Sequence, residues 1–93
     1  MTKSIKNSQE FIKNVLKEWE STFKGIKLKY AYDEDVQYHI IEVEPETIRR
    51  GNKDYMSKEA QLYMDFMFAF ENENILICNP SSANNMSNIL FNN

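Results

Sequence analysis

Apolar residues near the start of the chain recur every three or four positions, as they do along one face of an amphipathic helix. They are Phe11, Ile12, Val15, Leu16, Trp19 and Phe23. Lys13 and Lys17 fall on the opposite side, and Gly25 follows, where a left-handed residue commonly ends a helix. The pattern predicts a helix over residues 8–24, with Trp19 in the protein core.

Two stretches with strand character come next. Residues 26–32 alternate between apolar and polar, and residues 36–43 are rich in β-branched and aromatic side chains. Asp33-Glu34-Asp35 lies between them and is typical of a turn. With Glu34 and Asp35 as a two-residue loop, we expect an antiparallel hairpin that pairs Ile26 with Val43, Leu28 with Ile41, and Tyr30 with His39.

The second half of the chain predicts one more helix and one more strand. Residues 46–55 indicate a loop, with or without a short helical turn after Pro45. A helix then begins at Asp54 or Ser57 and ends near Glu71. Its circumference is mostly apolar: Ala60, Leu62, Tyr63, Met64, Phe66, Met67, Phe68 and Phe70. A helix of this kind is either deeply buried or has a second apolar partner. Residues 75–78 predict a short buried strand.

The resulting α-β-β-α-β order predicts an α+β two-layer sandwich. We expect a three-stranded, mainly antiparallel sheet with the third strand beside the first and two helices on one face. Residues 1–80 form the single α+β domain. Residues 81–93 are a Ser/Asn-rich tail that either stays free or docks through its apolar residues, which are Met86, Ile89, Leu90 and Phe91.

Composition narrows the function. The net charge is −3, which disfavours nucleic-acid binding because that binding needs many Lys and Arg side chains. The element order is similar to that of KH-type RNA-binding domains, but the chain has no Gly-x-x-Gly segment. Cys78 is the single cysteine, whereas small secreted domains usually carry paired ones, so we expect a cytoplasmic protein. No apolar run is long enough to cross a membrane.

Few residues carry recognisable chemistry. His39 is the single histidine and the first candidate for a general base, but in a strand Glu42 points to the opposite face and cannot orient it. We therefore interpret His39 as structural and expect His39→Gln to be well tolerated. Cys78 is interpreted as a buried free thiol at the end of a strand, and Arg49 and Arg50 as part of a solvated loop. We expect no cofactor and no metal site, since one His and one Cys cannot complete a zinc tetrad.

The surplus of apolar residues on the second helix is the strongest functional signal. Leu62 and Phe66 are expected to face the sheet, which leaves Met64 and Phe68 for the tail, the first helix or another protein to cover. Tyr38 and Ile40 are expected on the open face of the sheet. We predict an interaction surface made of Met64, Phe68, Tyr38 and Ile40, which binds a protein partner or a second copy of the chain.

The predicted function is therefore a small non-enzymatic protein-binding or regulatory module of the inhibitor, antitoxin, immunity or adaptor type. The abundance of Lys, Asn and Ile fits an AT-rich bacterial or phage gene. Two alternatives stay open. One is a small ligand-binding domain or enzyme that uses His39, and the other is an RNA-binding domain that uses Tyr38. A pocket around His39 would favour the former, and a basic rim around Tyr38 the latter.

Overall fold

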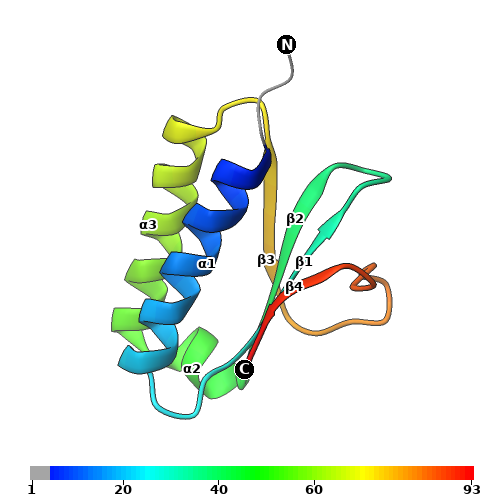
Figure 1. Cartoon of the computed structure of the whole chain (residues 1–93). Helices are drawn as coiled ribbons and strands as arrows, with labels where there is room; N and C mark the ends of the chain where they lie inside the picture. Colours follow the sequence, from blue (N-terminus) through cyan, green and yellow to red (C-terminus); the bar gives the residue numbers. More distant parts are fainter. Residues whose placement is uncertain (1–4) are drawn as a thin grey trace.

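The computed structural model describes residues 5–93, with the backbone alone for Ile5. It is an α+β fold in which helices cover one face of a mixed four-stranded sheet (Figure 1). Its elements are α1 (Ile5–Thr22), β1 (Lys27–Asp33), β2 (Tyr38–Glu44), α2 (Glu46–Gly51), α3 (Lys53–Ala69), β3 (Asn74–Cys78) and β4 (Ile89–Asn92).

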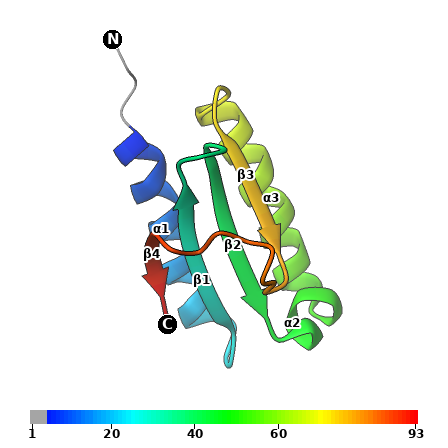
Figure 2. The same cartoon turned by 90° about the vertical axis from the view of Figure 1, so that its right-hand side faces the viewer.

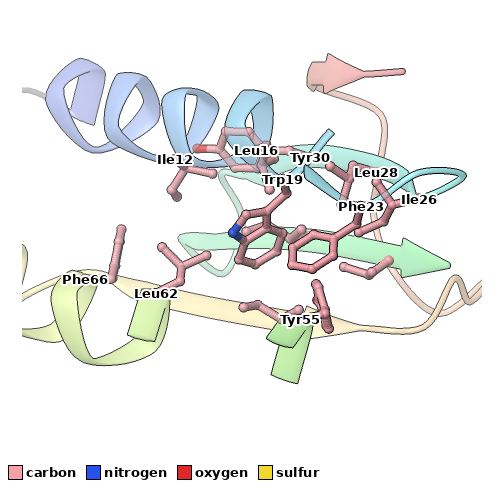
Figure 3. Packing of buried hydrophobic residues seen from close by; sticks show 13 residues of the cluster. Ile12, Leu16, Trp19, Phe23, Ile26, Leu28, Tyr30, Tyr55, Leu62 and Phe66 are labelled. Carbon is pink, nitrogen blue, oxygen red and sulfur yellow. The ribbon is translucent and has the colours of Figure 1, made fainter. Parts of the chain in front are cut away.

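Helix α1 forms for the reason that its pattern predicts, although it begins earlier and ends two residues sooner than expected. Its buried apolar side chains are Ile12, Leu16, Trp19 and Phe23, the last lying just beyond the helix. They meet the sheet and α3 in one core (Figure 3). The ring of Trp19 packs edge-on against the ring of Tyr55, with the two ring centroids 5.1 Å apart. Gly25 has a φ of 84°, a conformation that suits glycine, in the turn that leads to β1.

The two strands of the hairpin present the expected faces, but the register that we predicted is wrong. Strand β1 pairs with β2 antiparallel, and each partner is displaced by two residues from the expected one: Leu28 with Val43, Tyr30 with Ile41, and Tyr32 with His39. The loop spans residues 34–37 instead of two residues, with Gln37 at a φ of 59°. In the observed register both Lys27 and Lys29 lie opposite glutamates, whereas in the predicted register only Lys27 would lie opposite one.

The strand order also differs from the prediction. It is β3-β2-β1-β4, so β3 lies beside β2 and parallel to it, not beside β1. The edge of β1 is taken instead by β4, which pairs with it antiparallel. Asn93 fastens this end of the chain, because its side-chain oxygen accepts a hydrogen bond from the Leu28 N–H at 2.7 Å and its amide donates to the Ile26 carbonyl at 3.1 Å. The Ser/Asn-rich segment therefore contributes a strand to the sheet.

The segment that leads to β4 crosses the sheet face opposite the helices. Figure 2 shows residues 79–88 passing in front of β2 and β1 on their way to β4. The carboxylate of Glu42 holds this segment, because its Oε2 accepts hydrogen bonds from the Ser81 N–H at 3.2 Å and from the Asn84 amide at 2.7 Å. The face that we expected to be open is therefore partly covered. None of the helices in residues 5–93 is long and apolar enough to span a bilayer.

Candidate functional site

The outer side of α3 carries a stripe of exposed apolar side chains. Met64 is 59% exposed, Met67 66% and Phe68 89%. At 100° per residue these positions lie on the side of the helix opposite Leu62 and Phe66, which are buried against the sheet. We define the α3 stripe as Met56, Ala60, Met64, Met67 and Phe68, all of which are exposed.

The helix that carries the stripe is held from several directions. The side chain of Asn52 accepts a hydrogen bond from the Tyr55 N–H at 3.0 Å and caps the helix start. Towards the sheet edge, the Tyr63 hydroxyl accepts a hydrogen bond from the Ile77 N–H of β3 at 3.0 Å. Phe66 lies at full burial in the core. The stripe is therefore displayed on a fixed platform rather than on a loop.

Two shallow hollows adjoin the stripe. One is lined by Met64, Met67, Phe68 and Glu71. The other lies between α2 and α3 and is lined by Arg49, Arg50, Met56, Glu59, Ala60 and Tyr63. The outer side of the helix is therefore uneven, and its flexible methionine side chains can move into or out of these hollows.

The four residues of the predicted interaction surface do not form one surface. The structure brings Met64 and Phe68 together on α3, but Tyr38 and Ile40 belong to β2. They alternate along the strand with His39, which packs against Phe66 of α3, and so they lie on the sheet face that points away from α3. Ile40 is only 4% exposed, so its placement on an open face was wrong. Residues 79–88 cross this face (Figure 2), which the strand pattern alone does not reveal. Tyr38, at the rim, is 36% exposed.

Among the described residues nothing covers Met64 and Phe68. The tail, one of the two intramolecular covers that we considered, lies at the far edge of the sheet as β4. The prediction missed Met67 and Met56, which are exposed beside Met64. Their helical spacing of three and eight residues from Met64 was visible in the sequence and could have identified both.

His39 lies in a buried polar cluster that sequence reasoning did not find. Its Nδ1 is 2.7 Å from the Tyr30 hydroxyl, and its Nε2 is 2.8 Å from Oε1 of Glu73. The Ser8 hydroxyl donates to the same Glu73 oxygen at 2.6 Å and lies 3.4 Å from Nε2. An ionised carboxylate accepts and cannot donate, so Nε2–H donates to Glu73 and the Tyr30 hydroxyl donates to Nδ1. The cluster joins α1, β1, β2 and the turn before β3.

Burial decides what this cluster can do. His39 and Ser8 are both 0% exposed, so neither can touch a substrate. Burial lowers the pKa of His39 and favours the neutral ring, against the opposing effect of the Glu73 hydrogen bond and charge. Burial also raises the pKa of Tyr30, and the charge of Glu73 adds to the effect. The arrangement is that of a satisfied structural network, since a general base must reach the proton that it removes.

Arg49 is part of a second internal cluster instead of a solvated loop. Its guanidinium donates to the Asn79 side chain at 2.9 Å and to the Ile77 carbonyl at 3.0 Å, and it lies 3.5 Å from the Glu59 carboxylate. The same carboxylate accepts a hydrogen bond from Tyr55 at 2.6 Å. Arg49 donates hydrogen bonds to β3 and to Asn79, the residue after β3, and forms an ion pair with α3. It therefore serves to join these elements rather than to hold a phosphate.

The remaining candidates have local roles. Cys78 is a half-buried free thiol, and burial raises its pKa, so it is a poor nucleophile. Asp33 accepts a hydrogen bond from the Asp35 N–H at 3.0 Å within the hairpin turn. Within residues 5–93 no three His, Cys, Asp or Glu side chains come together as metal ligands do.

We compared the chain with protein-family models, with curated proteins and with solved structures, and none matched.

Proposed function

We propose that this protein is a non-enzymatic protein-binding module and that the α3 stripe is its docking surface. The observation that carries the proposal is the exposure of Phe68, of which 89% is open to solvent on a helix whose other side is packed in the core. A phenylalanine on a helix surface contributes nothing to the core of its own chain. Met64 and Met67 flank it at 59% and 66% exposure, so the exposed apolar area is continuous and not scattered.

The chemistry of the stripe suits a protein partner. Covering a Phe or Met side chain stabilises a complex by about 1.5–3 kcal/mol for each fully buried residue. Methionine side chains adapt their shape to a partner, while Phe supplies rigid area. The side chains of the stripe are apolar, and the hollow beside Met64 and Phe68 adds only the Glu71 carboxylate with which a small polar ligand could be oriented. A binding module of the inhibitor, antitoxin, immunity or adaptor type in the bacterial cytoplasm fits these features.

The two alternatives have less support. A ligand-binding site or enzyme at His39 would need an opening to the ring, and His39 is fully buried with both ring nitrogens bonded. RNA binding at Tyr38 would need basic side chains around it. Its partners in the sheet are Asp33 and Asn74, which supply none.

Site-specific photo-crosslinking tests the proposal. A photoreactive residue at position 64, in an extract of the source cells, should yield a discrete product that contains another protein chain, identical or different. The matched control is position 36 in the hairpin loop, since Val36 is 57% exposed but lies outside the stripe. Equal yields at the two positions, or no product at position 64, would contradict the proposal.

A further inference from the structure

The outer side of α3 shows heptad spacing in addition to its apolar character. Five exposed residues of α3 follow one another at alternating intervals of four and three: Lys53, Ser57, Ala60, Met64 and Met67. Glu71, which is also exposed, continues the spacing just beyond the end of the helix. Alternating intervals of this kind place residues along the seam by which two helices pack side by side. We call these six residues the seam. Phe68 lies beside it on one flank and Met56 on the other.

The seam is complementary to itself when a second copy runs in the opposite direction. Consider an antiparallel pair whose two-fold axis passes at the height of Leu62. A residue that lies a given number of positions before residue 62 then faces the residue of the second copy that lies the same number of positions after it. Ala60 then faces Met64 of the second copy, and Ser57 faces Met67. Lys53 faces Glu71. Each layer therefore sets a small side chain against a methionine or a cation against an anion.

Charge distinguishes this arrangement from a parallel one. Parallel packing would set Lys53 against Lys53 and Glu71 against Glu71, which is repulsive. In residues 5–93, neither Lys53 nor Glu71 forms an ion pair within its own chain, since the pairs found there join other residues. Glu71 lies just beyond the end of α3 and lines the same hollow as Met64, Met67 and Phe68. It is thus placed at the end of the seam, where an opposing cation would arrive.

We propose that the partner of the α3 stripe is a second copy of this chain, bound antiparallel along α3 with Ala60 facing Met64 and Lys53 facing Glu71 across a two-fold axis. The inference rests on the proposed function and specifies its partner. The helices of the two copies form adjacent inner layers, and the two sheets lie outside them. Antiparallel helices also bring the positive start of each dipole near the negative end of the other.

Charge reversal tests the register. Sedimentation equilibrium should give a dimer for the wild type, and Lys53→Glu or Glu71→Lys should each raise the dissociation constant by about tenfold, because each sets like charges together twice. The double variant should return close to the wild-type value, since Glu then faces Lys again. A mixture of the two single variants should form mixed dimers in preference to either homodimer. Lys17→Glu, an equal reversal on the exposed side of α1, is the control and should change nothing.

Two results would overturn the inference. One is a wild type that stays monomeric at concentrations approaching 1 mM, the range of the weakest specific contacts. The other is a double variant that dissociates as readily as the single ones, because the assumed pairing would then be absent. If the chain is monomeric while position 64 crosslinks to a different protein, the homodimer is wrong and the proposed docking surface stands. All exchanged side chains are exposed, and urea unfolding of each variant verifies that the fold is retained.

Discussion

The phenolic oxygen of Tyr30 lies 2.7 Å from Nδ1 of His39, although the two residues are not partners across the strands. Tyr30 is paired with Ile41, and His39 with Tyr32. The contact is therefore diagonal, which aromatic side chains can span between adjacent strands. Together with Glu73 on the other ring nitrogen, it leaves the buried imidazole with both of its nitrogens bonded.

Replacing this histidine should weaken the fold, contrary to what its sequence context indicated. We expect His39→Gln to lower the free energy of unfolding by about 1–3 kcal/mol, because the shorter, non-aromatic side chain leaves buried partners unbonded. Chemical denaturation measures the change. Tyr38→Gln, at the adjacent rim position, is the control and should stay within about 0.5 kcal/mol. A loss of that small size for His39→Gln would restore our first interpretation.

The same cluster should make stability depend on pH. The pKa of His39 is lower in the folded protein than its ordinary value of 6.5, chiefly because burial disfavours the charged ring. The unfolded chain therefore binds a proton at higher pH than the folded chain does. The contribution of neutral His39 is complete above pH 6.5 and is lost as the pH falls below it, at up to about 1.4 kcal/mol per pH unit.

This dependence should appear as a difference between two proteins. The imidazole ring of His39 is surrounded by Ser8, Tyr30, Tyr32, Phe66 and Glu73. The gap in unfolding free energy between wild type and His39→Gln should narrow as the pH falls from 7 to 5, since Gln does not titrate. A gap that widens instead would mean that the folded protein holds His39 protonated against Glu73.

Local patterns predicted the elements of the fold well, and long-range choices less well. The arc around Trp19 specified α1 because helical periodicity is a local signal. The faces of the hairpin followed from the alternation of apolar and polar residues. The register, however, depended on a four-residue loop with Gln37 in a left-handed conformation. The sequence does not indicate this conformation, because no glycine or asparagine stands at that position. The position of β3 depended on whether the tail would take the edge of β1. That choice rests on contacts such as those of Asn93, which lie far apart in sequence.

Trp19 gives the clearest test of the core. It is buried at 1% exposure and packs edge-on against Tyr55. Trp19→Ala should cost about 3–5 kcal/mol, because it removes a large aromatic side chain and leaves a cavity. Urea unfolding followed by circular dichroism measures this. A cost below about 1 kcal/mol would show that α1 packs through another face.

The strand at the chain end should matter for stability as well. Removing residues 89–93 deletes β4, exposes one edge of β1 and loses the packing of Leu90 and Phe91 on the core. We expect the free energy of unfolding to fall by about 1.5–3 kcal/mol, as two half-buried apolar side chains imply. Thermal and urea denaturation of the truncated chain would measure it. Unchanged stability would mean that β4 does not hold this position.

The site was partly visible in the sequence. The excess of apolar residues on α3 pointed to Met64 and Phe68, because a helix can bury only one side against a sheet. Ile40 was misplaced because alternation along a strand does not show that a distant segment, residues 79–88, crosses the same face of the sheet. The cluster of Ser8, His39 and Glu73 was missed for the same reason, since its members come from three distant parts of the chain.

The most direct test of the docking surface combines stability and contact in one variant, Phe68→Glu. At a concentration low enough to keep the chain monomeric, its unfolding free energy should lie within about 0.5 kcal/mol of wild type, because Phe68 is 89% exposed and is not part of the core cluster. The crosslink from position 64 should disappear, while Val36→Glu leaves it intact. A variant that loses more than about 2 kcal/mol would show that Phe68 belongs to the core. A stable variant that still crosslinks would show that α3 does not dock its partner here.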